Sequence, residues 1–289
     1  MSKLGIAPSS LTEEGRDLLQ SGQRMFDEVV VINPHNMWVA FENNTARVFS
    51  GQDDVSDLDV LIVRRTQNMG AAISVLVRAL EFNGCNVVDP ISRYSVGFAS
   101  KLKTSIRRWR DGCGPDSYFA FSATAARDMI THMRQNGSYP AIIKPINGRG
   151  SDGKIIVNTA KATRPISTQF FADRDGDDMP LFMQKFEDIT HEYRVVVVNG
   201  TVIAAVLKNK TSNRSTGSEF TRLPDRAVDI VGQRTSAVCN PEGIFGIDVG
   251  FTSDRRIIII EENRAPEWRR LQEVSGVNIA DAILTNIGQ

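Results

Sequence analysis

The stretch of sequence that decides the fold is FGIDVGFTSDRRIIIIEENRAP, residues 245–266. Two apolar runs flank the polar segment Thr252–Arg255, a pattern that is typical of a β-hairpin. Three side chains with oxygen atoms interrupt these runs: Asp248 on the first, and Glu261 and Asn263 on the second. Mg²⁺ prefers such ligands and leaves its remaining positions to water and phosphate. The stretch therefore indicates a hairpin that carries a magnesium site.

Convergence of the three side chains depends on the register of the hairpin. If the turn is centred on residues 253–254, Asp248 lies opposite Ile259. Because side chains alternate along a strand, Glu261 and Asn263 then point the same way as Ile259. A three-residue turn or a bulge would break this relationship. The alternative is that all three are solvent-facing polar residues of an edge hairpin.

Composition favours an ordinary globular protein. The 289 residues allow two or three subdomains with a sizeable core. Lys plus Arg and Asp plus Glu both number 34, so no net field draws the chain to nucleic acid or a membrane. The arginine-rich segment 105–112, SIRRWRDG, is better explained as a solvated helix face than as a nucleic-acid site. We expect neither nucleic acid nor a membrane as a partner.

Cysteine usage and the N-terminal residues predict a cytoplasmic location. Cys85, Cys113 and Cys239 are few, odd in number and far apart, which is typical of reduced thiols. The first residues contain no apolar segment typical of a signal peptide, and no run approaches the ~20 apolar residues that span a bilayer. The three scattered histidines indicate no metal cluster.

Element order predicts an α/β (α+β) fold in three parts. A strand at 29–32, a strand at 59–63, a helix at 71–82 and a strand at 86–89 form an N-terminal parallel unit over residues 1–98. A central lobe over residues 99–182 contains two strands joined by a glycine-rich loop. A C-terminal lobe over residues 183–289 contains a hairpin closed by Asn199-Gly200, a strong turn signal.

The glycine-rich loop KPINGRGSDGK, residues 144–154, is a candidate phosphate site. Its glycines let backbone N–H groups approach phosphate oxygens, although a plain flexible hairpin loop explains them about as well. Lys144 strengthens the phosphate interpretation, because it sits inside the predicted apolar strand 141–146, where an ammonium without an anion is unfavourable. A lysine on an exposed edge strand is the alternative.

Two further segments are weaker signals on their own. The linker MQKFEDITHEYR, residues 183–194, offers backbone groups that can read an adenine edge, and Glu192 can bind ribose hydroxyls. Lys101 stands just before a predicted helix and by itself would be an ordinary surface lysine.

Taken together, these pieces resemble the ATP-grasp superfamily, and within it the RimK-like ligases that add glutamate or another amino acid to a carboxylate. The resemblance is carried by SKLKTS, IIKPINGRGSDG, MQKFE, HEYRVVVVNGTVIAAV, FGIDVGF and IIEENRAP, and covers residues 59–285. It implies a Rossmann-like pre-ATP-grasp subdomain followed by two α+β lobes that grip ATP.

The resemblance also implies roles for individual residues. Asp248, Glu261 and Asn263 would hold Mg²⁺ (or Mn²⁺), and Arg194 and Arg214 would meet the γ-phosphate or the acyl substrate. The implied ATP contacts are Lys101, Lys144, Gly148, Gly150, Ser151, Gly153, Gln184, Lys185, Glu187, Glu192 and Lys208.

Where this chain departs from the family, the acceptor is open. The family's Ala or Ser, Ser, Pro, Gly after the metal asparagine reads Arg264-Ala265-Pro266-Glu267 here. The additional arginines Arg264, Arg269 and Arg270 can recognise an acidic acceptor or can form a solvated helix face.

The implied reaction is ATP-dependent amide formation through an acylphosphate, with release of ADP and phosphate. The implied partners are an amine or amino-acid donor and a carboxylate-bearing peptide, protein or small molecule, and a homo-oligomer is left open. Two alternatives remain: a phosphotransferase that acts on a hydroxyl, and a nucleotide-binding protein without turnover.

Overall fold

The computed structural model describes residues 2–8, 12–42, 45–64, 70–88, 98–144, 154–173, 180–209, 219–239 and 241–287. The chain packs into two compact units. Unit one comprises residues 1–95, 191–250 and 260–289, and unit two comprises residues 96–190 and 251–259. The division into three parts at residues 98 and 182 stays a prediction.

Unit one begins with a parallel sheet in the order β2-β1-β6-β7. Its strands are β1 (Lys3–Pro8), β2 (Glu28–Val31), β6 (Val60–Arg64) and β7 (Asn86–Val88), with helices α1 (Glu13–Met25) and α2 (Gly70–Phe82). The parallel N-terminal sheet confirms the sequence prediction. The prediction missed β1, and the cap of α1 is Thr12, whose side chain accepts from the N–H of Gly15 at 3.3 Å.

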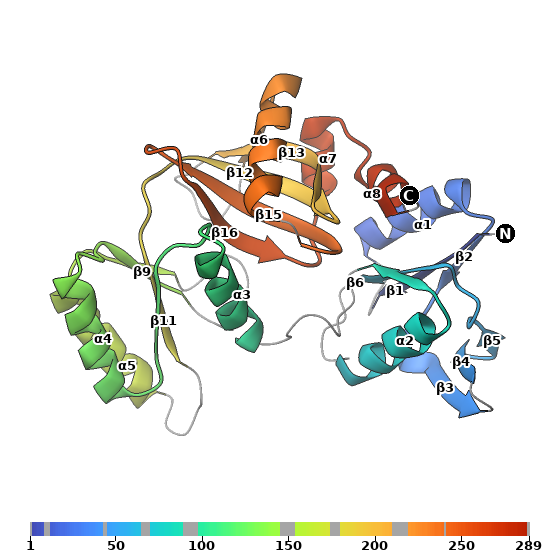
Figure 1. The fold of residues 1–289 in the computed structure, drawn as a ribbon, viewed down its shortest axis with the longest axis horizontal. Helices are drawn as coiled ribbons and strands as arrows, with labels where there is room; N and C mark the ends of the chain where they lie inside the picture. The colour runs from blue at the N-terminus through green and yellow to red at the C-terminus, as the bar shows by residue number, and fades with distance from the viewer. Residues whose placement is uncertain are drawn as a thin grey trace. The chain divides into compact units, whose positions relative to one another are not determined.

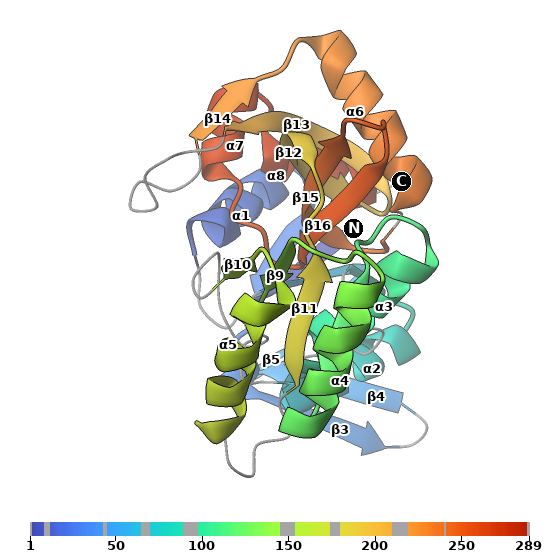
Figure 2. The ribbon, with the colours of Figure 1, turned by 90° about the vertical axis from the view of Figure 1, so that its left-hand side faces the viewer.

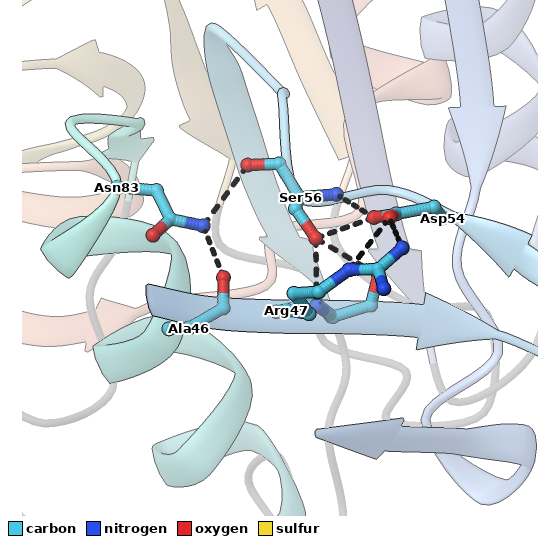
Figure 3. A network of polar contacts seen from close by, with 6 residues as sticks. Ala46, Arg47, Asp54, Ser56 and Asn83 are labelled. Carbon is cyan, nitrogen blue, oxygen red and sulfur yellow. Dashed lines mark hydrogen bonds and ion pairs between the residues drawn. The ribbon is translucent and has the colours of Figure 1, made fainter. Parts of the chain in front are cut away.

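A small antiparallel sheet lies between β2 and β6 in the chain. After the short helix η1 (Pro34–Asn36), strands β3 (Met37–Glu42) and β4 (Thr45–Ser50) pair, and β5 (Asp53–Asp54) joins β4. Figure 3 shows what ties this sheet to α2: the Asn83 amide donates to the carbonyls of Ala46 at 2.7 Å and Ser56 at 3.1 Å.

A five-stranded sheet in the order β14-β13-β12-β15-β16 carries most of the chemistry. Its strands are β12 (Ile189–Val198), β13 (Thr201–Asn209), β14 (Glu219–Arg222), β15 (Ile244–Thr252) and β16 (Ile257–Asn263). Asn199 and Gly200 both have positive φ, 45° and 79°, as a two-residue hairpin turn requires. The predicted turn is therefore confirmed.

One core in unit one joins the parallel sheet to the five-stranded sheet. Buried Leu4 and Ile62 belong to the same cluster as Val196, Val206 and Trp268. The C-terminal helix α8 packs beside α1, as Figure 1 shows. The helices in this part of the chain are α6 (Asp225–Val238), α7 (Arg269–Ser275) and α8 (Ile279–Ile287).

Unit two is built on an antiparallel sheet in the order β10-β9-β11-β8. Its elements are α3 (Phe98–Arg110), β8 (Ser117–Ala120), α4 (Ala123–Gln135), β9 (Ala141–Ile143), β10 (Ile155–Val157), α5 (Ala160–Ala172) and β11 (Leu181–Lys185). Figure 2 shows α4 and α5 side by side. Thr159 caps α5, where its side chain accepts from the N–H of Ala162 at 3.2 Å, and Pro165 lies inside the helix.

The turn between β15 and β16 differs from the prediction. The Thr252 N–H donates to the Arg256 carbonyl at 3.1 Å, and the Arg255 N–H donates to the Thr252 carbonyl at 3.0 Å. Three residues therefore form the loop, and Arg255 takes a left-handed φ of 67°. Along an unbroken ladder this pairing sets Asp248 opposite Ile260. The predicted even-length turn is therefore wrong, and strand alternation no longer puts Asp248 on the same face as Glu261 and Asn263.

The same turn supports a prediction about pH. A hydrogen bond from the Thr252 hydroxyl, then one from Arg256 at 2.8 Å, lowers the pKa of Asp254 to about 2. A depressed carboxyl pKa stabilises the fold above the ordinary value of 3.8, and this contribution is lost as pH falls towards 2. We expect the unfolding temperatures of wild type and Asp254→Asn to differ slightly at pH 5 and to converge at pH 2. A constant difference across that range would contradict the assignment.

All three cysteines are buried free thiols. In the part of the chain that the structure describes, no helix has both the length and the apolar character needed to cross a bilayer.

Candidate functional site

Asp248 is a buried carboxylate on β15. It is 3% exposed, although every other residue from Ile244 to Gly250 is apolar or glycine. Its two carboxylate oxygens accept from the guanidinium of Arg194 in a bidentate pair, with Nη2 at 2.9 Å from Oδ2. A buried carboxylate is stable only with such compensation.

Lys208 connects Asp248 to Glu192. Its ammonium donates to Asp248 Oδ2 at 3.0 Å and also to Glu192 Oε1. The side chains of Lys208 and Glu192 are each 19% exposed. Two carboxylates and two cations therefore meet at one place in unit one.

The strand register explains this meeting. Glu192 and Arg194 lie two residues apart on β12, so they share a face. Lys208 is the partner of Glu192 across the β12–β13 ladder, and β15 borders β12 on its other side. The sheet thus brings together four predicted site residues from three strands.

The electrostatics of the cluster keep Lys208 charged. Burial on its own would lower the pKa of Lys208, but the charges of Asp248 and Glu192 and their hydrogen bonds outweigh burial. The net effect raises the pKa of Lys208 above its usual 10.5. The cluster is therefore two cations paired with two anions, and its formal charges cancel.

The other predicted metal ligands lie on β16. Glu261 is half-buried and Asn263 is exposed, and because they are two residues apart they share a face of the strand. The Asn263 side-chain oxygen accepts from the N–H of Ala265 at 3.0 Å. No group of three His, Cys, Asp or Glu side chains among the described residues is close enough to hold a metal ion.

The donor types nevertheless fit Mg²⁺, because two carboxylates and one amide oxygen are hard ligands. The burial of Asp248 adds nothing to this fit, because Arg194 and Lys208 already supply the positive charge that a buried carboxylate requires. The magnesium assignment stays a prediction.

Unit two contains a second polar chain, centred on Gln184 of β11. The ammonium of Lys144 donates to Gln184 Oε1, and Gln184 Nε2 donates to the Ser117 hydroxyl at 2.9 Å. Gln184 is 4% exposed. Because its oxygen is held by Lys144 and its nitrogen by Ser117, the amide is oriented and so is the lysine. The structure brings together Lys144 and Gln184, two predicted nucleotide contacts.

The linker after β11 is held by its backbone. The Lys185 N–H donates to the Asp116 carbonyl at 2.9 Å, and the Phe186 N–H donates to the Pro140 carbonyl at the same distance. The Glu187 carboxylate pairs with Arg256 at 2.9 Å. The Glu187 side chain is therefore engaged by Arg256 at the turn between β15 and β16. The predicted contact with adenine would use the backbone of Glu187 instead.

Several predicted residues lie outside the description. Lys101 is in α3, but its side chain is not described. The residues that lie outside the described part of the chain are Gly148, Gly150, Ser151, Gly153 and Arg214.

Two of the additional arginines contact the protein itself. Arg269 pairs with Asp17 at 2.8 Å, and the Arg270 guanidinium lies 5.7 Å from the centre of the Phe220 ring. These contacts favour a structural role on α7 over recognition of an acceptor. Arg64 contacts Pro266 and Trp268, which follow Asn263 closely in the chain, and the sequence did not predict these contacts. The sequence feature that points to Arg64 is its position as a charged residue directly after the apolar run VLIV, residues 60–63.

A family model and several known proteins match this chain. Residues 112–287 match the family model for the RimK-like ATP-grasp domain. A probable alpha-L-glutamate ligase from Shewanella halifaxensis is 23% identical over 99% of this chain and 62% of its own length. The chain thus spans less than two thirds of that relative. The alpha-aminoadipate–LysW ligase LysX of Sulfurisphaera tokodaii is 24% identical over 98% of this chain and 97% of its own.

Solved structures share the fold. The ATP-grasp ligase PsnB, complexed with a minimal precursor, has a TM-score of 0.72 at 15% identity and covers 99% of this chain and 98% of its own. With minimal precursor, Mg and ADP, PsnB has a TM-score of 0.70 at 14% identity, covering 99% of this chain and 96% of its own. The fold is the ATP-grasp fold, and the chain belongs to the RimK-like ATP-grasp family.

Proposed function

We propose that the protein is an ATP-dependent carboxylate–amine ligase that forms an amide through an acylphosphate and releases ADP and phosphate. The observation that carries the proposal is the buried cluster of Asp248, Arg194, Lys208 and Glu192 in a chain of this family. Such a cluster pairs a candidate metal ligand with cations suited to phosphate.

The reaction explains why positive charge matters more than a side-chain nucleophile. A carboxylate is a poor electrophile, and phosphorylation supplies its leaving group. The protein then has to position the reactants and neutralise charge on the transferred phosphoryl group. Mg²⁺, when bound by Asp248, Glu261 and Asn263, would neutralise part of the charge on the ATP phosphates.

The proposal assigns ATP contacts to residues of unit one and to residues of unit two. In unit one, Arg194 and Lys208 bind phosphate oxygens, and Glu192 binds ribose hydroxyls while it holds Lys208. In unit two, Lys144 binds phosphate with its ammonium oriented by Gln184, and the backbone of Lys185 and Glu187 borders adenine. The proposal also assigns phosphate contacts to Lys101 and to the loop residues Gly148, Gly150, Ser151 and Gly153, and a substrate contact to Arg214.

The proposed partners are an amino acid or other amine and a carboxylate-bearing peptide, protein or small molecule. LysX is named for ligation to LysW, and PsnB was solved with a precursor. Glutamate is the first donor to test, since a curated relative is a probable alpha-L-glutamate ligase. A cytoplasmic location belongs to the proposal as well.

The function is tested by an ADP-release screen over amino acids and carboxylate acceptors, followed by mass spectrometry of the products. We expect ADP, not AMP, and a product whose mass equals amine plus acid minus water. A product that gains only a phosphoryl group would replace the proposal with a phosphotransferase. Nucleotide binding without turnover, over the full screen, would replace it with a non-catalytic nucleotide-binding protein.

A further inference from the structure

The segment Arg264–Trp268, which follows β16, is held in place from several sides. At its start, the N–H of Ala265 donates to the Asn263 side-chain oxygen at 3.0 Å. In its middle, Pro266 is buried and its carbonyl accepts from Arg64 at 2.9 Å. At its end, Trp268 is fully buried. Pro266 and Trp268 therefore anchor the segment in unit one, although Glu267 between them is exposed.

Arg64 makes two of these contacts. It is the last residue of β6 and is 4% exposed. Its Nη2 donates to the Pro266 carbonyl, and its guanidinium lies 4.6 Å from the centre of the Trp268 ring. A buried guanidinium is favourable only where acceptors or π faces replace water. Residues 266 and 268 supply one of each, so Arg64 acts on both ends of a three-residue stretch.

The segment also packs directly on the strand that carries Asp248. A Cβ on Gly246 would lie 2.6 Å from the Cβ of Pro266, so only glycine leaves room for this approach. Gly246 and Asp248 are two residues apart on β15 and share a face. The position of Pro266 is thus set by Arg64 on one side and by β15 on the other.

The segment Arg264–Trp268 also contacts the side chain of Asn263. Only an oxygen can accept from the Ala265 N–H, so this hydrogen bond orients the amide and leaves the oxygen a second lone pair. A displaced segment would move the Ala265 N–H and release the amide. Groups that orient metal ligands in this way influence metal affinity although they do not touch the metal.

We infer that Arg64 is a positioning residue for the magnesium ligands: it holds Pro266 and Trp268 and thereby fixes the side chain of Asn263 relative to β15. The inference rests on the proposed function, since it takes Asn263 and Asp248 as ligands of Mg²⁺. It adds a residue of the N-terminal sheet to the determinants of the metal site.

The test measures binding of the non-hydrolysable nucleotide AMPPNP by calorimetry over a series of Mg²⁺ concentrations. We expect the Mg²⁺ midpoint of Arg64→Ala to be about ten-fold above that of wild type. Arg64→Lys should fall between them, because an ammonium can donate to the Pro266 carbonyl but lacks the planar group that stacks on Trp268. AMPPNP binding in EDTA should be equal in all three proteins.

A matched control is available in the same unit. Arg47 also lies over an aromatic ring, 4.8 Å from the centre of Phe49, and it pairs with Asp54 at 2.6 Å, as Figure 3 shows for the Asp54 contact. Arg47→Ala removes a comparable cation–π contact from the small β3–β4–β5 sheet, and its Mg²⁺ midpoint should equal that of wild type. A shift as large as that of Arg64→Ala would overturn the inference, because it would reflect a general loss of stability.

A second perturbation covers the case in which Arg64→Ala fails to fold. Gly246→Ala presses on Pro266 from the opposite side, and it should raise the Mg²⁺ midpoint too. Hydrogen exchange of the peptide that contains residues 264–268 should be faster in both variants. Unchanged Mg²⁺ midpoints in folded Arg64→Ala and Gly246→Ala proteins would overturn the inference but not the proposed function. Wild type that shows no Mg²⁺-dependent AMPPNP binding overturns the proposed function, and the inference with it.

Discussion

Asp248→Asn is expected to lose about 10³-fold in Mg²⁺-dependent ADP release while it keeps the fold. The amide has nearly the shape of the carboxylate but no charge, so it is a weaker ligand for Mg²⁺ and does not compensate Arg194 and Lys208. Both cations would still face the site, and the loss would appear in kcat more than in nucleotide binding. Steady-state rates of ADP release at saturating Mg²⁺ measure the effect.

The same substitution has a second consequence, for stability. Asp248 accepts hydrogen bonds from Arg194 and Lys208, whose side chains are 23% and 19% exposed. Removing one partner of a buried ion pair leaves the others uncompensated, and with this partial exposure we expect a decrease of about 2 kcal/mol in the free energy of unfolding. Urea denaturation in EDTA measures it without the metal.

Glu192→Gln is the matched control, because it also removes a carboxylate bonded to Lys208 but leaves Asp248 with both cations. Its ADP release should fall much less than that of Asp248→Asn. Equal losses in the two variants would mean that net charge in the cluster matters and that Asp248 has no special role as a ligand. Wild-type rates in Asp248→Asn would remove the residue from the site.

Local chemistry explains what could be read from the sequence. Asn199-Gly200 predicted its hairpin because both residues tolerate positive φ, which few others do. The apolar run at 59–63 predicted the strand that became β6, and all five residues of β6 are buried, as is typical of a strand covered on both faces. Ser122 is of the residue type that caps helices, and its side chain accepts from the N–H of Ala125 at 3.1 Å at the start of α4. Each signal involves residues close together in the chain.

The failures have the opposite character. The segment KLGIAP contains glycine and proline, which disfavour strands, yet β1 lies between β2 and β6 because the sheet around it supplies partners on both sides. The odd turn length after β15 depends on Arg255 in a left-handed conformation that the Thr252–Asp254–Arg256 contacts support. Arg64 and Pro266 are 202 positions apart. Long-range contacts decided β1 and the position of Arg64, whereas the turn depended on a local left-handed conformation at Arg255 that the residue type does not indicate.

Lys144→Met is expected to lower kcat/KM for ATP about 10²-fold, because it replaces the ammonium that the proposal assigns to phosphate with an uncharged chain of similar length. The ammonium is oriented by Gln184, so its loss removes a preorganised charge. Initial rates of ADP release over a range of ATP concentrations measure the change.

The free energy of unfolding distinguishes the proposed phosphate-binding role of Lys144 from a purely structural role. In Lys144→Met the Gln184 amide keeps its bond to Ser117 at 2.9 Å and loses the one from Lys144, so unfolding should become easier by only about 1 kcal/mol. Lys161→Met, on the exposed side of α5, removes a lysine of the same unit and should leave both quantities unchanged. A Lys144→Met protein with wild-type kcat/KM would show that the lysine serves Gln184 alone.

Lys144→Arg distinguishes charge from geometry, since a guanidinium keeps the charge but cannot act as a compact point donor. A partial recovery of kcat/KM relative to Lys144→Met is the expected result.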